Sequence, residues 1–154
     1  MTNETITIEP FTGAAIAPWL PELARLRIEQ FRGYPYFYDG DAAYEEKYLA
    51  ALPENPHNQL LVARQGDDVA AMATAMPLTV DADILEDVDG NFREHGLDPA
   101  GFYYYGEILV RPEYRNQGIA RRFYALRESH ARGLGYQAVC FATFHDPLKT
   151  LDRP

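Results

Sequence analysis

Cysteine, long apolar segments and positive charge are all scarce in this sequence of 154 residues. The single cysteine, Cys140, can form no disulfide within the chain and no zinc site built from several thiolates, so no metal is predicted. No apolar run approaches the roughly 20 residues that a membrane-spanning helix needs. Residues 1–10 contain neither the Lys nor the Arg that a signal peptide would have. We therefore predict a cytoplasmic protein that has no membrane partner.

The formal net charge of -9 is unevenly distributed along the chain. Residues 1–100 carry 6 basic and 18 acidic side chains, whereas residues 101–154 carry 8 and 5. Binding to nucleic acid depends on a basic surface that neutralises phosphates. The composition therefore argues against a nucleic-acid partner, but it allows a small anion to bind the last third of the chain.

The length and the 47% share of hydrophobic residues are typical of one globular domain, here residues 1–154. Alternation and helical spacing of apolar residues predict strands at 5–9, 58–64, 68–77, 101–110 and 136–144, and helices at 17–32, 41–52, 81–95 and 117–133. Pro10 is expected to end the first strand, and the last strand is expected to be buried. This order indicates a mixed α/β domain.

Two packing expectations follow from the same patterns. The buried face of the helix at 117–133 is predicted to comprise Ile119, Phe123, Leu126 and His130. The many alanines of the hairpin formed by the strands at 58–64 and 68–77 indicate close packing against a helix.

The segment richest in chemical information joins the strand at 101–110 to the helix at 117–133. It reads Arg, Asn, Gln, Gly, Ile, Ala from Arg115 to Ala120. The first amides of a helix have no acceptor within the helix, and the helix dipole adds about half a positive charge there, so this geometry suits an anion. The glycine patterns of ATPases and of Rossmann dehydrogenases are absent, which disfavours both classes.

This segment resembles the acetyl-CoA motif of the GNAT acetyltransferases, which is Arg or Gln, two residues, Gly, one residue, then Gly or Ala. The preceding Val110, Pro112 and Tyr114 are similar to the residues that commonly precede the motif in that family. The resemblance implies the GNAT acyltransferase fold. It also implies transfer of the acetyl group of acetyl-CoA to a primary amine of a small molecule or a peptide, by direct attack in a ternary complex.

The resemblance also implies which residues bind acetyl-CoA. The amides of residues 117–120 would hold the pyrophosphate, and the backbone of Ile108 and Val110 would bond the pantetheine like an added strand, with the Val110 amide as oxyanion donor. Arg115 would order the loop or touch a phosphate. The full expected set is Ile108, Val110, Arg115, Asn116, Gln117, Gly118, Ile119 and Ala120.

Glu107 is the predicted catalytic base. It lies in an otherwise apolar strand, at a place where many family members carry an acidic residue. Burial among Tyr103 and Tyr105 would raise its pKa. The alternative is a carboxylate that only pairs with an arginine, and His145, just after the last strand, is the reserve base.

Tyr34, Tyr36 and Tyr38 are the predicted acceptor-binding residues, because they lie between the first two helices, which border the acceptor pocket in the family. Their rings could frame an amine, and packing of the rings is the alternative. Nearby acidic residues favour a cationic acceptor, although a solvated helix start explains them as well: Asp39, Asp41, Glu45 and Glu46.

The end of the sequence keeps a second function open. The family fold continues with a helix and two further strands and often uses a tyrosine there to protonate the leaving thiolate, yet no tyrosine follows Tyr136 and ten residues follow Phe144. The expectation is a shortened fold. A non-catalytic CoA-binding sensing or interaction module is therefore the alternative to the enzyme. An exposed edge at the last strand predicts pairing into a homodimer.

Overall fold

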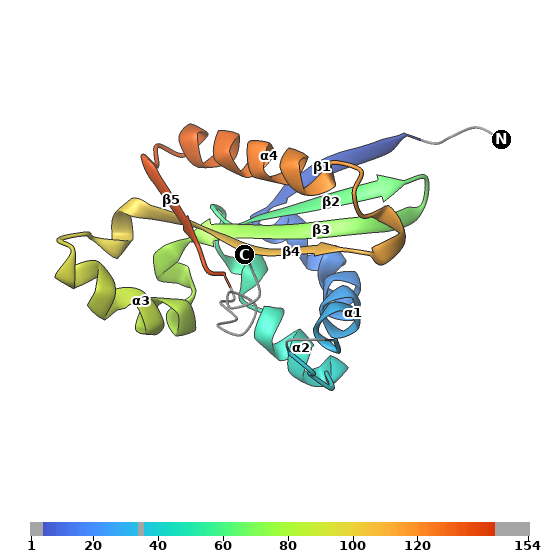
Figure 1. Cartoon of the computed structure of the whole chain (residues 1–154), viewed down its shortest axis with the longest axis horizontal. Helices are drawn as coiled ribbons and strands as arrows, with labels where there is room; N and C mark the ends of the chain where they lie inside the picture. Colours follow the sequence, from blue (N-terminus) through green and yellow to red (C-terminus); the bar gives the residue numbers. More distant parts are fainter. Residues whose placement is uncertain (1–4, 34–35, 144–154) are drawn as a thin grey trace, which may run out of the picture.

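A five-stranded sheet forms the centre of the computed structural model, which describes residues 5–33 and 36–143 (Figure 1). The strand order follows the chain: β1 (Ile6–Thr12), β2 (Gln59–Gln65), β3 (Asp68–Pro77), β4 (Phe102–Val110) and β5 (Ala138–Phe141). Neighbouring strands are antiparallel except β4 and β5, which are parallel. The mixed sheet confirms the predicted fold class.

Helices cover both faces of this sheet (Figure 1). α1 (Leu20–Phe31), α2 (Ala42–Leu49) and α3 (Ala82–Glu94) lie on one side, and α4 (Ile119–Gly133) lies on the other. Short 3-10 segments connect these elements at Gly13–Trp19, Leu52–Glu54, Leu78–Val80, Pro99–Gly101 and Pro112–Tyr114. No helix in the described part of the chain has the length and the hydropathy that crossing a membrane would require.

The predicted packing of the hairpin against a helix is confirmed. Four buried alanines of β2 and β3 lie in one cluster with Ile119 and Phe123 of α4; they are Ala63, Ala70, Ala71 and Ala73. Small side chains let the helix approach the sheet closely, which brings the N-terminal end of α4 next to the end of β4.

Two predicted boundaries were wrong because of proline. β1 does not end at Pro10, which pairs with Leu61 of β2. β1 is an edge strand, where a missing N–H removes no bond if it faces the open side. The helix predicted to begin at residue 17 is a 3-10 segment until Leu20, because Pro18 disfavours the α conformation for the residue before it.

Two predictions of burial were also wrong. Leu126 of α4 is 38% exposed, and the buried positions are Ile119, Phe123, Arg127 and Ala131. The stripe follows a strict spacing of four residues and therefore includes a charged side chain. β5 was predicted as a buried strand, but it is shorter and Phe141 is 55% exposed, because β5 is at the edge of the sheet.

A β-bulge in the middle of β4 determines which way its side chains point. Ala73 of β3 pairs with Ile108, and Ala75 pairs with Tyr105, so Gly106 and Glu107 together face the single residue Thr74. The extra residue reverses the alternation of side chains beyond it. Tyr103 and Tyr105 pack beside α4, whereas Glu107 lines a cavity on the side of α1.

The side chains of Thr74 and Arg127 stabilise this bulge by hydrogen bonds to its backbone, from opposite sides of the sheet. The Oγ1 atom of Thr74 accepts a hydrogen bond from the Glu107 amide at 3.0 Å. Arg127, only 1% exposed, donates to the carbonyl oxygens of Thr74 at 3.1 Å and of Gly106 at 3.5 Å. Its guanidinium lies over the ring of Tyr105, 4.5 Å from the centroid, and burial lowers its pKa below the ordinary value for arginine.

We expect Gly106→Ala to destabilise the fold, because a Cβ atom there would lie 2.2 Å from Thr74 Oγ1. Overpacking of this kind costs about 1–3 kcal/mol, which urea unfolding would measure. Gly101→Ala is the matched control, since nothing lies within 4 Å of its Cβ position, and its stability should stay within about 0.5 kcal/mol. Equal stability of the two variants would show that the bulge tolerates a side chain.

Candidate functional site

Two cavities lie on either side of β4 and share it as a wall. The first, here called the α4 cavity, has a volume of about 490 Å³ and lies between the end of β4 and the start of α4. The second, here called the Glu107 cavity, has a volume of about 350 Å³ and lies beneath the sheet, between α2, α3 and β4. Their lining residues differ in charge, which separates what each can bind.

The loop that enters α4 presents backbone amides to the α4 cavity. Gly118 precedes the helix with a φ of 80°, and Asn116 has a φ of 62°, both in the left-handed region that turns successive N–H groups to one side. No side chain caps the helix, and its first backbone bond is donated by the Arg122 amide to the Gly118 carbonyl. The preceding amides are therefore available to an anion.

Nearly all of the predicted acetyl-CoA residues line this cavity. They are Ile108, Val110, Arg115, Asn116, Gly118, Ile119 and Ala120, joined by Gln30, Tyr114 and Arg121. Gln117 is the exception, because its side-chain amide turns back towards the Glu113 carbonyl at 3.4 Å. The space beside Gly118 is open, since no atom lies within 4 Å of the position of a Cβ atom.

The edge of β4 that faces away from β3 is open beyond Tyr105 in the described residues. β5 pairs with β4 only from Phe102 to Tyr105. The amides of Glu107 and Arg111 point towards β3, where Thr74 Oγ1 and the Ala70 carbonyl accept them. Backbone groups alternate along a strand, so those of Ile108 and Val110 point to the open edge. An extended chain with amide groups can add to this edge as a further strand would.

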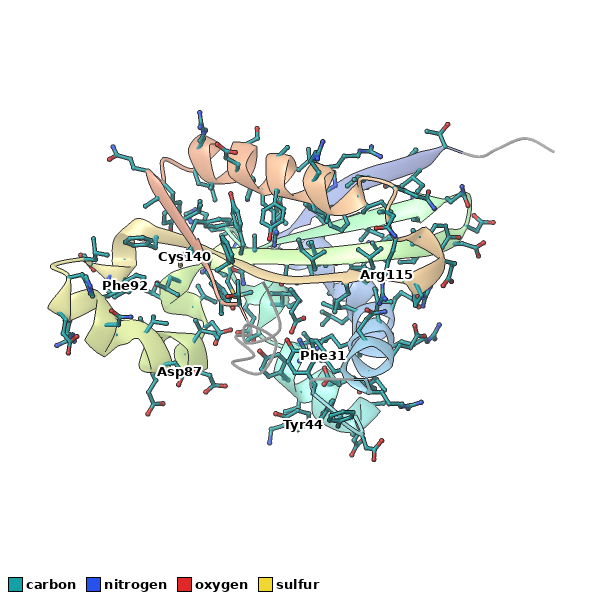
Figure 2. All side chains as sticks on the ribbon, viewed as in Figure 1. Phe31, Tyr44, Asp87, Phe92, Arg115 and Cys140 are labelled. Carbon is teal, nitrogen blue, oxygen red and sulfur yellow. The ribbon has the colours of Figure 1, made fainter. Side chains whose placement is uncertain are left out.

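Arg115 connects this edge to α1 (Figure 2). Its Nε atom donates to the Val110 carbonyl at 3.2 Å, and its Nη2 atom donates to the Gln30 side-chain oxygen at 3.0 Å. Arg115 was predicted either to order the loop or to touch a phosphate. These two hydrogen bonds are of the kind that orders the loop. The guanidinium also adds positive charge to the rim of the α4 cavity, as does Arg121.

Glu107 lies on the wall of the other cavity, and its side chain is 27% exposed. The prediction that it lies among Tyr103 and Tyr105 was wrong, because the bulge turns it to the opposite face of the sheet. Its carboxylate forms an ion pair with Arg27 of α1. Such a carboxylate is held in one place and still reaches the cavity.

Arg27 is shared between two carboxylates, in a cluster that the sequence did not suggest. Its Nε atom lies 2.5 Å from Oε2 of Glu45, which is fully buried. The guanidinium also lies over the rings of Tyr48 and Phe31, at 4.7 Å and 5.0 Å from their centroids. Glu45 is therefore neither a solvated residue of the helix start nor free to attract a cationic acceptor, because it is buried and paired with Arg27.

Two of the predicted acceptor tyrosines, Tyr36 and Tyr38, belong to the described residues and pack among other aromatic rings. Tyr36 is exposed and packs against Phe31, with ring centroids 4.8 Å apart, and Tyr38 lies beside Tyr44. Neither lines the Glu107 cavity or the α4 cavity. Tyr34 and the reserve base His145 lie outside the described residues.

The Glu107 cavity has other aromatic walls, Tyr48 and Tyr104. Burial raises the pKa of Tyr104 to about 12, and the charge of Asp81 adds to the shift. Both rings are therefore neutral donors at physiological pH. The sequence holds one signal for this site. Arg27 is a charged residue in the apolar stripe of α1, beside Leu23 and Leu26, and a charged residue is rarely buried unless it is paired.

Cys140 gives no sign of being a nucleophile. It is half-buried in β5, and burial raises the pKa of its thiol, which lowers the share of the reactive thiolate. Cys140 therefore has the properties of a small packing residue.

We expect Arg27→Met to lower the free energy of unfolding by about 3–5 kcal/mol, because the charge of Glu45 would remain buried without its ion-pair partner. Arg132→Met is the matched control, since Arg132 pairs with Glu128 on the surface and should cost less than about 1 kcal/mol. Urea unfolding measures both. The double variant Arg27→Met, Glu45→Met should recover part of the lost free energy of unfolding. If Arg27→Met alone were as stable as the parent protein, Arg27 would not be needed to neutralise Glu45.

The comparisons with known proteins agree with this geometry. Residues 20–150 match the Acetyltransferase (GNAT) family. No curated protein matches the chain. Among solved structures, an aminoglycoside acetyltransferase from an uncultured soil metagenomic sample, in complex with trehalose, is 15% identical with a TM-score of 0.61, covering 96% of this chain and 83% of that one.

Two further structures are similar to a comparable extent. An aminoglycoside N-acetyltransferase in complex with CoA is 16% identical with a TM-score of 0.61, covering 97% of this chain and 83% of that one. A ribosomal-protein-alanine N-acetyltransferase from Brucella melitensis biovar Abortus 2308 is 16% identical with a TM-score of 0.58, covering 94% and 84%. At such identities the structures establish a shared fold. With most of its length matched by the family, and with the family's loop at the start of α4, the chain belongs to the GNAT acetyltransferases.

Proposed function

We propose that this protein transfers the acetyl group of acetyl-CoA to a primary amine of a small molecule. One observation carries this function: β4 separates a cavity of backbone amides and arginines from a cavity that holds a fixed carboxylate. A cofactor bound on one side and an amine bound on the other would meet at the bulge, where the sheet is open. The ternary complex of a direct transfer needs this arrangement.

The α4 cavity fits the diphosphate and pantetheine parts of CoA. Amides of Gly118, Ile119 and Ala120 are available at the helix start, and Arg121 adds positive charge. The open edge of β4 offers the backbone groups of Ile108 and Val110 to the amides of the pantetheine. Bound acetyl-CoA would supply the thioester.

Glu107 is the group best placed to accept the proton that the amine loses. Attack by an amine on a thioester carbonyl forms the C–N bond, breaks the C–S bond and releases one proton from nitrogen. Arg27 and the Glu107 amide bond to Thr74 hold this carboxylate at the cavity wall. The amide of Val110, directed to the open edge, would donate to the oxyanion.

Gly118→Glu should weaken binding of acetyl-CoA roughly tenfold or more, because a carboxylate would stand where phosphate binds. Gly118→Asn is the control for backbone strain, since asparagine tolerates a φ of 80° and adds no charge. Calorimetric titration of each variant measures the affinity. Equal binding by the parent protein and Gly118→Glu would remove the loop from the site.

Glu107→Gln should lower kcat by roughly 100-fold or more and leave the affinity for acetyl-CoA unchanged, since it removes the base but not the α4 cavity. Glu128→Gln, on the exposed face of α4, is the control and should retain full activity. The readout is CoA thiol release with a panel of primary amines. Full turnover by Glu107→Gln would transfer the role to another base, with His145→Gln as the next variant.

The same panel tests the non-catalytic alternative. Binding of acetyl-CoA without thiol release above background, for every amine, would identify a CoA-binding sensing or interaction module instead of an enzyme.

A further inference from the structure

We infer that the Glu107 cavity selects amines that carry a second positive charge, such as aliphatic diamines. This inference rests on the proposed function and specifies its acceptor. Among the described residues, four charged side chains line the cavity: Arg27, Asp81, Asp83 and Glu107. Arg27 is already paired with Glu45 and Glu107, so its charge is neutralised within the protein. Two carboxylates, those of Asp81 and Asp83, remain for a ligand.

Both aspartates belong to the start of α3, at the open side of the cavity. Asp81 caps the helix through a 3.1 Å bond from the Ile84 amide to its Oδ1 atom. Asp83 is exposed in the first turn of the helix. Their negative charges contribute to the raised pKa of Tyr48, after the larger effect of burial, so they lie close to a ring that lines the cavity. A cation at this rim would lie near two carboxylates and two aromatic rings.

A buried acceptor atom without a partner supplies independent support. Asn58 is fully buried and lines the same cavity. Its Nδ2 group donates to the Leu52 carbonyl at 3.0 Å, whereas its Oδ1 atom has no hydrogen-bond partner among the described residues. A buried acceptor in this state favours a ligand that donates a hydrogen bond, as the amine that reacts beside Glu107 can.

The remaining lining is apolar and suits a hydrocarbon chain between two amines. Leu49, Leu52, Met76, Val80 and Ile84 all contribute to it. A volume of about 350 Å³ is at the small end of the range for ligand sites and accommodates a chain of a few carbons. One amine would lie beside Glu107 for reaction, and the second would lie at the rim beside Asp81 and Asp83.

Three acceptors with the same carbon chain separate the effect of the second charge from the effect of the hydrocarbon chain. Cadaverine has an ammonium group at each end of five carbons, pentylamine replaces one of them by a hydrogen atom, and ε-aminocaproate replaces it by a carboxylate. With saturating acetyl-CoA and the full chain, we expect kcat/KM to fall in that order, with cadaverine roughly tenfold above pentylamine at low salt. The difference should shrink at high salt, because the rim is exposed.

Asp83→Asn tests the rim directly. It should reduce the ratio of kcat/KM for cadaverine over pentylamine roughly fivefold, mainly through KM. Asp81→Asn should act in the same direction and keep the helix cap, since asparagine caps as well as aspartate. Asp87→Asn is the matched control on the same helix, because Asp87 is exposed and points away from the sheet (Figure 2). It should leave the ratio unchanged.

The outcomes distinguish this inference from the proposed function. Equal kcat/KM for cadaverine and pentylamine would overturn the selection of a second charge and leave the transferase intact. If no amine is turned over, calorimetric titration of cadaverine into the CoA-saturated protein decides the matter. Binding that Asp83→Asn weakens would support the cation site and refute the transferase, and absence of binding would refute both.

Discussion

The arrangement of the site depends on the β-bulge in β4, where Gly106 and Glu107 together lie opposite the single residue Thr74. Without the extra residue, Glu107 would lie beside α4 with Tyr103 and Tyr105, far from the cavity that it lines. The bulge also coincides with the end of the pairing between β4 and β5, which leaves the backbone of Ile108 and Val110 at an open edge. In the part of the chain that the structure describes, the unpaired edge of β4 and the carboxylate on the cavity wall thus both lie next to the bulge.

Two buried arginines stabilise this region in different ways. Arg127 bonds the carbonyl oxygens on both strands of the bulge and has aromatic rings around it, with no carboxylate among its described partners. Arg27 satisfies two carboxylates from α2 and β4. Charges of this kind are costly to bury unless they are bonded, so their positions restrict how the helices can pack on the sheet.

The acidic and the basic parts of the sequence lie at different places in the fold. The acidic first 100 residues supply α3 and its rim of Asp81 and Asp83, and the more basic remainder supplies Arg115 and Arg121 at the α4 cavity. β4 lies between them, so the described charged side chains at its two sides differ in sign. A cofactor with phosphates and an acceptor with amines would thereby approach from different sides.

The sequence by itself determined the order of the elements, the hairpin, the Asp41 cap of α2 and the loop that leads from β4 into α4, because these depend on local periodicity, turn chemistry and helix termini. It did not determine that Arg127 rather than Leu126 is buried, that Glu45 pairs with Arg27, or that Tyr48 and Tyr104 line the Glu107 cavity. Those features join residues that are distant in sequence. Only the tertiary structure decides them, because the bulge in β4 and the packing of α1 and α4 on the sheet select which side chains meet.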